Sequence, residues 1–279
     1  FMTPCLHANS RDEPVSVAIV GGGATGVELA AEIHHAVAML KLYGHEHLDR
    51  KQLKVTVVEA LPRILPGLSE RVSAAAQERL EGLGVSVRTG VMVARATEDA
   101  LITKDDETIS ADLMVWAAGV KAPDFVGKLE GFALNKINQI EVSPTLQAKG
   151  NDRVFVVGDC AFLKPDGDDK PIPPRAQAAQ QMASHTAKNL QRLIMNRDPK
   201  PFRYRDHGSL VSLSNYSSVG MLMGNLKGGN FFVEGWLARL MYVGLYRMHQ
   251  AALYGWPRTL MLLTAGRFSK LVRPRMKLH

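Results

Sequence analysis

Three glycines near the start of the sequence, Gly21, Gly23 and Gly26, lie between an apolar, β-branched run and a pattern typical of a helix. Their G-x-G-x-x-G spacing suits a dinucleotide: the first glycine permits a tight turn, the second admits a pyrophosphate close to the backbone, and the third lets the helix pack on the strand. The N–H groups and positive dipole end of the helix then face the phosphates. Glycine turns also occur for conformational reasons alone, so the context of the pattern matters.

A second apolar run, residues 53–58, ends at Glu59, where the fingerprint places an acid for the ribose hydroxyls. The acid follows the glycines by more than the usual ~20 residues, because residues 34–52 lengthen the helix and add a polar loop. A carboxylate repels a 2′-phosphate, and residues 60–62 contain no cation, so the sequence predicts NADH in preference to NADPH. Arg63 is the nearby residue that could weaken this preference, and a solvated carboxylate at a strand end is the alternative interpretation.

The elements that must position these residues follow from the hydrophobic periodicity, and they form a dinucleotide-binding unit over residues 15–120. The prediction is a strand at 15–20, a helix from Gly26, a strand at 53–58, an amphipathic helix at 69–84 that ends at Gly84, a strand at 85–90, and a β-meander that ends in a buried strand at 113–117. Beyond a turn-rich connection, residues 154–163 predict a strand with a Gly-Asp turn, and residues 175–194 predict a helix.

Composition narrows the class of protein. At 279 residues the chain is long enough for about two domains. Its two cysteines, Cys5 and Cys160, form no C-x-x-C or zinc pattern, so nothing indicates a metal site or an oxidising compartment. The first 14 residues do not resemble a signal peptide, and the start at Phe1 suggests a fragment or a processed chain.

Basic residues are concentrated at the C-terminal end of the sequence. The chain carries a formal charge of +7, yet eight of its 34 Lys and Arg residues and none of its 27 Asp and Glu residues lie from Gly235 onward. This tail is too charged to span a bilayer. It repeats apolar residues at helical spacing, namely Leu237, Met241, Leu245 and Met248, with Trp236 and Trp256 as interfacial anchors.

The tail therefore predicts amphipathic helices on an anionic membrane surface, attracted by about 1 kcal/mol per basic residue. Packing on the protein's own core and a homodimer interface are the alternatives. A nucleic-acid role is disfavoured, because the residues between the arginines are aliphatic and form no stacking platforms.

Several stretches carry a resemblance to a known family: VAIVGGGATGVELAAE, VVEA, LMVWAAGVKAPDF, VFVVGDCA, PPRAQAAQQMA, DHGSLVSLSN and the terminal RPRMKLH. From Val15 to His279 the sequence resembles the bacterial type II NADH dehydrogenases, which are single-subunit, non-proton-pumping NADH:quinone oxidoreductases. The resemblance implies two Rossmann-like domains, the first for FAD and the second for NADH, and a membrane-binding region. It also implies a peripheral location on the cytoplasmic face of the bacterial inner membrane.

One departure from the family pattern concerns the FAD domain, which in the family begins with its own G-x-G-x-x-G strand and helix. No match to that segment precedes Val15. The expected fold class is therefore α/β, with a Rossmann-like NADH-binding domain, the returning half of a Rossmann-like FAD domain, and a C-terminal membrane-associating helical region. The expected boundaries are 1–14 for a leader or truncated connection, 15–120 for the NADH domain, 121–200 for the FAD segment and 201–279 for the C-terminal region.

The resemblance also implies roles for particular residues in binding the two cofactors. Gly21, Gly23, Gly26 and Glu59 would hold NADH, with Ala118 and Gly119 near its adenine-side half. Ligands of open α/β sheets do lie beyond strand ends, although a plain strand-to-loop turn is the alternative at Ala118 and Gly119. Gly158 and Asp159 would bind FAD, with Asp159 accepting a hydrogen bond from the ribityl chain. Cys160 is interpreted as a buried small residue.

Three further residues, Glu28, Gln177 and Gln181, would serve catalysis by the same resemblance, and Ala176 would help to bind a cofactor. Ala176, Gln177 and Gln181 match an A-Q-x-A-x-Q motif near the isoalloxazine and quinone, and glutamines four apart on a helix can point into one pocket. The alternative is a pair of glutamines on a solvated helix face. Glu28 would lie near the flavin and nicotinamide and relay protons toward the quinone; the alternative is an acid that favours the first helical turn through the dipole.

The resulting hypothesis is an NADH:quinone oxidoreductase in which a hydride passes from NADH to FAD and electrons then reach a membrane quinone. A soluble NAD(P)H-dependent flavoprotein reductase of the same fold is one alternative, which the basic tail and the paired glutamines oppose. A flavin-free fragment that binds NADH and membranes without activity of its own is the other, and the missing FAD segment supports it.

Overall fold

The computed structural model describes residues 14–42, 52–165, 167–168, 170–207, 209–213, 217–222 and 231–272. The chain divides into two compact units, one made of Phe1–Ala118 with Gly208–His279 and the other of Gly119–His207. The expected boundaries at 120 and 200 thus fall slightly differently, and the C-terminal region shares a unit with the glycine motif. The expected leader lies outside the described residues, except for its last residue.

A parallel sheet forms the centre of the first unit, with strand order β3-β2-β1-β7. Its strands are β1 (Val15–Val20), β2 (Leu53–Val58), β3 (Ser86–Arg88) and β7 (Leu113–Trp116). The strand predictions are confirmed in place, but the expectation that the last strand is buried is wrong. It lies at the edge of the sheet with a single neighbour, and the side chain of Trp116 is 60% exposed.

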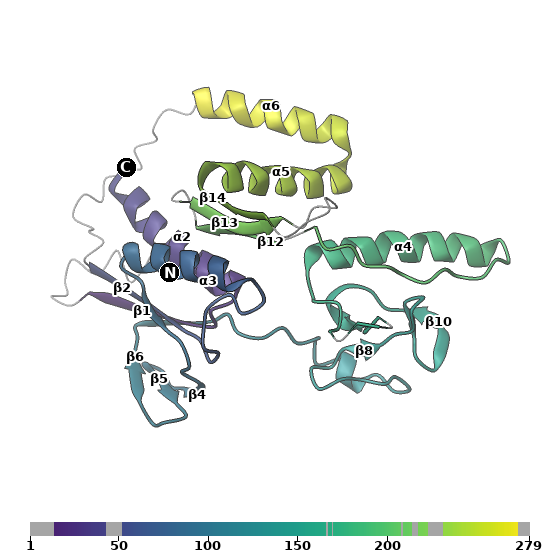
Figure 1. Cartoon of the computed structure of the whole chain (residues 1–279), viewed down its shortest axis with the longest axis horizontal. Helices are drawn as coiled ribbons and strands as arrows, with labels where there is room; N and C mark the ends of the chain where they lie inside the picture. Colours follow the sequence, from purple (N-terminus) through teal and green to yellow (C-terminus); the bar gives the residue numbers. More distant parts are fainter. Residues whose placement is uncertain are drawn as a thin grey trace. The chain divides into compact units, whose positions relative to one another are not determined.

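Two helices cover one face of this sheet, α2 (Ala24–Leu42) and α3 (Glu70–Gly82) (Figure 1). The predicted periodicity of α3 is confirmed, because Val72, Ala76 and Leu80 are fully buried in the same core as the apolar residues of β1 and β2. Ser69 caps the start of α3 by accepting a hydrogen bond from the Val72 N–H at 3.4 Å. Gly84 follows the helix with a φ of +91°, as expected of a helix terminator.

An antiparallel meander packs against the other face of the sheet. It consists of β4 (Val93–Ala96), β5 (Ala100–Thr103) and β6 (Thr108–Ser110). Ala18 and Val20 of β1 form a small core with Leu101 and Ala111 from the meander side. The sheet is therefore a layer between helices and a meander, which matches the burial that parallel strands require.

The C-terminal part of the first unit begins with a second antiparallel sheet, β12 (Ser209–Leu213), β13 (Ser217–Leu222) and β14 (Phe231–Glu234). Val211 and Leu213 are at most 1% exposed and belong to the core beneath α2 and α3. This shared core explains why residues 208–279 do not form a separate domain. Helix α5 (Gly235–Tyr254) lies between this sheet and α6 (Trp256–Val272) (Figure 1).

The second unit contains short strands and one long helix. Its elements are the 3-10 turn η3 (Val126–Lys128), β8 (Ile140–Glu141), β9 (Gln147–Ala148), β10 (Asn151–Phe155), the 3-10 turn η4 (Gly158–Cys160), β11 (Ala161–Phe162) and α4 (Ala176–Ile194). β9 pairs with β10, and β8 pairs with β11. Ala178 and Met182 anchor α4 in the core of this unit. Cys160 is half-buried against that core, so the expectation of a buried cysteine is wrong.

Candidate nucleotide-binding site

The turn between β1 and α2 tolerates no side chain at its first and last glycines. Gly21 has a φ of +111°, and a Cβ there would lie 2.8 Å from the backbone N and Cα of Ala118. A Cβ on Gly26 would overlap the carbonyl oxygen of Gly21. The Gly21 N–H also donates to the Val58 carbonyl at 2.7 Å. Glycine at these two positions therefore brings the start of α2 close to the strand ends.

Gly23 differs from its neighbours, because no atom lies within 4 Å of the position that a Cβ would occupy. It directly precedes α2, whose first N–H groups have no partner within the helix. A pyrophosphate suits this position, because open space lies beside exposed backbone N–H groups and the positive end of the helix dipole. The residues present thus fit a dinucleotide at this turn.

The Glu59 carboxylate is held at the same turn by two backbone donors. Its Oε2 accepts from the Gly22 N–H at 2.7 Å, and its Oε1 accepts from the Leu61 N–H at 2.9 Å. Each carboxylate oxygen has a further lone pair for a hydroxyl donor. The carboxylate is therefore fixed at the turn, and its binding of a ribose stays a prediction.

The loop that follows Glu59, residues 61–68, also supports the glycine turn, which the sequence analysis missed. The Leu65 N–H donates to the Gly22 carbonyl at 2.7 Å, and a Cβ on Gly22 would lie 2.8 Å from Cγ2 of the fully buried Ile64. Gly22 therefore has a packing role even though the motif does not require glycine there. These contacts involve backbone atoms, so the sequence carries little signal of them.

Arg63, the cation that could have favoured NADPH, is bound by its own loop. Its guanidinium donates to the carbonyls of Leu65 at 3.2 Å, Pro66 at 3.0 Å and Leu68 at 2.9 Å. The Arg63 side chain thus binds backbone acceptors and is not directed at Glu59.

The structure brings Ala118 to the glycine turn, since its backbone is the neighbour that limits Gly21. Gly119 has a φ of +77°, is exposed and begins the second unit. Glu28 is half-buried on α2, one residue beyond the first turn, which contains no acid. A simple dipole preference for the first turn therefore does not explain Glu28.

The second unit places the Gly-Asp turn beside the start of α4. Gly158 has a φ of +73°, its N–H contacts Sδ of Met182 at 3.4 Å, and a Cβ there would touch Ala179. The carbonyl of Asp159 accepts from Nε2 of Gln139 at 2.8 Å, while its side chain is exposed. An exposed carboxylate on a fixed turn fits a hydroxyl-bearing chain such as the ribityl group of FAD.

Gln177 and Gln181 share a face of α4, as predicted, but both amides bind a segment that is distant in the sequence. Gln181 pairs with the backbone of Arg205, donating at 2.8 Å and accepting at 3.0 Å. Gln177 accepts from the His207 N–H at 3.1 Å and donates to Asp206 at 3.2 Å. Both side chains are half-buried, and contact of either with a quinone stays a prediction. Ala176 is exposed at the first position of the helix.

An ion pair adjoins these glutamines. Arg175 contacts Asp206 at 3.2 Å, which fixes the carboxylate that Gln177 binds. Burial, together with the charge of Asp206, raises the pKa of the Tyr204 phenol in the same segment.

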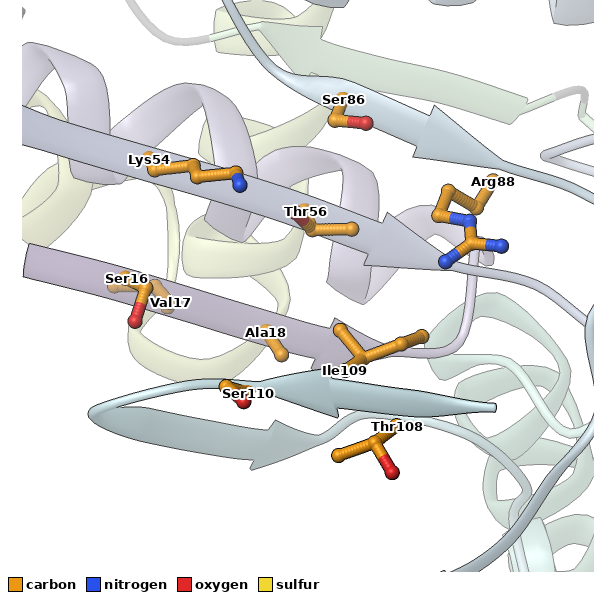
Figure 2. Close-up of a pocket in the computed structure, with 10 residues that line it drawn as sticks. All are labelled: Ser16, Val17, Ala18, Lys54, Thr56, Ser86, Arg88, Thr108, Ile109 and Ser110. Carbon is orange, nitrogen blue, oxygen red and sulfur yellow. The ribbon is translucent and has the colours of Figure 1, made fainter. Parts of the chain in front are cut away.

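A polar cavity of about 350 Å³ lies elsewhere on the first unit, between the sheet and β6 (Figure 2). Lys54 and Thr56 line it and alternate along β2 with residues of the helix-side core, so the cavity lies on the opposite face from α2. The lining residues are Ser16, Val17, Ala18, Lys54, Thr56, Ser86, Arg88, Thr108, Ile109 and Ser110. Arg88 binds Glu107 through two contacts of 2.7 Å and holds the pKa of that carboxyl below its ordinary value. The pair joins β3 to the meander, and the Arg88 carbonyl also accepts a hydrogen bond from the Glu59 N–H at 2.8 Å.

The parallel sheet, the glycine turn and the acid at the end of β2 define a dinucleotide-binding protein of the Rossmann-like class. Residues 2–183 match the model of the family described as pyridine nucleotide-disulphide oxidoreductase. The chain belongs to the pyridine nucleotide-disulphide oxidoreductase family.

Relatives of known name cover most of the chain. A type II NADH:quinone oxidoreductase of Haemophilus influenzae is 45% identical over 268 residues, which are 96% of this chain and 60% of that protein. One of Staphylococcus aureus is 33% identical over 228 residues, which are 80% of this chain and 56% of that protein. The chain therefore spans less than two thirds of the length of these relatives.

Solved structures share the fold at low sequence identity. NDH2 from Plasmodium falciparum in complex with NADH has a TM-score of 0.77 at 17% identity, covering 97% of this chain and 68% of that one. A ferredoxin reductase from Rhodopseudomonas palustris has a TM-score of 0.55 at 20% identity, covering 78% of this chain and 48% of that one.

The second and third glycines of the motif should respond differently to alanine. Gly26→Ala introduces a Cβ onto a backbone oxygen, so the free energy of unfolding should fall by about 3 kcal/mol. Gly23→Ala adds a methyl group in open space, so stability should change by less than about 0.5 kcal/mol while NADH affinity falls about tenfold. Thermal unfolding and NADH titration measure the two effects, and unchanged NADH affinity in Gly23→Ala would remove the pyrophosphate from this turn.

Replacing the acid should change the choice of nucleotide. Glu59→Gln removes the charge that repels a 2′-phosphate, so the ratio of NADPH affinity to NADH affinity should rise about tenfold. Isothermal titration of both nucleotides measures this ratio. Glu98→Gln, an exposed change on the same unit, is the matched control. If Glu59→Gln keeps the original affinity ratio, as the control should, Glu59 does not face the ribose.

Proposed function

We propose that the chain acts as an NADH:quinone oxidoreductase, a flavoprotein that oxidises NADH and reduces a membrane quinone without pumping protons. The observation that carries the proposal is the Glu59 carboxylate, fixed by Gly22 and Leu61 at a turn whose second glycine faces open space. The names of the relatives in Haemophilus influenzae and Staphylococcus aureus support the same activity.

In this proposal the residues of the first unit bind and orient NADH. The N–H groups at the start of α2 receive the pyrophosphate beside Gly23, and Glu59 accepts hydrogen bonds from the ribose hydroxyls. Ala118 closes the turn against Gly21, and Gly119, which follows it in the chain as the first residue of the second unit, would lie at the adenine side. Selectivity for NADH arises because Glu59 repels a 2′-phosphate.

Gly158 and Asp159 would hold FAD at the turn before α4. When bound, FAD accepts a hydride from NADH and supplies electrons to the quinone. Gln181 retains a second amide hydrogen beyond its bond to Arg205, and with Gln177 it would donate to a quinone carbonyl. Glu28 would hold a proton on the path to the quinone.

The last two helices would bring the protein to the quinone by lying on an anionic membrane. They carry arginines and no acid, and α6 has a set of large apolar side chains that are 47–71% exposed. These are Trp256, Leu260, Met261, Leu262 and Phe268. Among the described residues, no helix is sufficiently long and apolar to cross a bilayer. Because arginines and exposed apolar side chains together suit an anionic lipid surface, the proposal places the protein peripherally on the cytoplasmic face of the membrane, with lipid at the exposed side of α6.

Flavin spectroscopy tests the activity. The purified chain, supplied with FAD and washed, should show a bound-flavin absorption band that bleaches when NADH is added without oxygen and returns when a quinone follows. Asp159→Asn should retain less flavin, whereas Asp152→Asn, another exposed aspartate of the same unit, should retain as much as the unchanged chain.

Two outcomes would contradict the proposal in different ways. A chain that retains no flavin would be an NADH-binding and membrane-binding fragment. A flavin that NADH bleaches but that only ferredoxin or a disulfide reoxidises would make the protein a soluble-type reductase of the same fold.

Membrane association should depend on α6. Leu260→Ser combined with Met261→Ser removes two exposed apolar side chains, so binding to vesicles with anionic lipid should weaken about tenfold. The control is Ile194→Ser combined with Met195→Ser, which removes two similarly exposed apolar side chains at the end of α4. Vesicle co-sedimentation measures both. Equal binding by the two variants would rule out α6 as the anchor, and loss of a dimer in the α6 variant would identify a dimer contact instead.

A further inference from the structure

Arg63 is the only basic residue between Glu59 and the start of α3, and its partners are unusual for a cation. Its guanidinium donates to three carbonyl oxygens, those of Leu65, Pro66 and Leu68. Within the part of the chain that the structure describes, no carboxylate pairs with it. The charge is therefore used to close a loop of its own chain.

The closed loop contains a residue in an unfavourable backbone conformation. Leu65 has a φ of +49°, a left-handed conformation that a leucine rarely adopts, and this turns its N–H toward Gly22 and its carbonyl toward Arg63. The Ile64 carbonyl accepts from Oγ of Ser73 at 2.7 Å, so the loop is also bound to α3. Arg63 thus connects Pro66 and Leu68, at the far end of the loop, to Leu65, which contacts the glycine turn.

The same loop supplies one of the two donors of the Glu59 carboxylate. Leu61 N–H binds Oε1, and Gly22 N–H binds Oε2, while Gly22 is itself held through its carbonyl by Leu65. A chain of hydrogen bonds therefore runs from the Arg63 guanidinium through Leu65 and Gly22 to the Glu59 carboxylate.

We propose that Arg63 is a positioning and selectivity residue of the nucleotide site. By closing its loop it holds Glu59 in position for the ribose hydroxyls. Because its guanidinium binds carbonyls, the positive charge of Arg63 is kept away from the 2′ position. The inference rests on the proposed function, in that the glycine turn must bind NADH. Moving the guanidinium to a 2′-phosphate would break three hydrogen bonds and leave the phosphate facing Glu59.

The test is nucleotide binding by the full chain and does not need flavin. Arg63→Ala should weaken NADH binding about fivefold, because Glu59 loses its fixed position, and should weaken NADPH binding less. In a Glu59→Gln background the same substitution should change NADH affinity by less than about twofold, because its effect passes through Glu59. Arg95→Ala, which removes an exposed arginine from β4, is the control for loss of charge.

Each other result has a distinct meaning. A larger loss for NADPH than for NADH in Arg63→Ala would mean that Arg63 contacts the 2′-phosphate, and it would overturn the proposal. Equal losses of NADH affinity with and without Glu59 would show a purely structural role and would also overturn it. If the unchanged chain bound no NADH, the proposed function would fail as well. Arg63→Gln, which keeps two N–H donors, replaces the alanine variant if that variant does not fold, with the same comparisons.

Discussion

The close approach of backbone to backbone at Gly21 is the constraint on which the first unit depends. A side chain on Gly21 would strike Ala118, and one on Gly26 would strike the Gly21 carbonyl, so α2 can start beside the strand ends only with glycine at both positions. Because β1, β2 and β7 are parallel, the same edge of the sheet also receives the residues that follow them. Glu59 and Ala118 reach the turn for this reason.

Local patterns predicted most of the elements of this unit. Apolar periodicity located β1, β2 and α3, and the glycine spacing located the turn, because both depend on neighbours in the sequence. The exposure of Trp116 could not be predicted, since edge position is a property of the assembled sheet. The inclusion of Leu213 in the first core could not be predicted either, because it results from packing between distant segments.

In the candidate site, too, sequence spacing predicted which residues share a face but not which distant residues contact them. Helical spacing correctly placed Gln177 and Gln181 on one face of α4, but spacing does not reveal what covers that face. The covering segment contains Arg205 and His207, more than twenty residues away in the sequence. Likewise, Glu59 was identified from its place at a strand end, whereas its bond to Gly22 depends on a loop with no motif of its own.

The distribution of charge among the described residues bears on how the proposed site would bind a dinucleotide. Two guanidinium groups near the strand ends are bound by the chain itself, Arg63 by carbonyls and Arg88 by Glu107. In the proposed site, attraction for the pyrophosphate would therefore come from backbone N–H groups and the dipole of α2, which do not distinguish NADH from NADPH. In the proposed site, discrimination depends on the negative charge of Glu59, a repulsive element that acts only on the phosphorylated nucleotide. Keeping Arg63 on its loop preserves that repulsion.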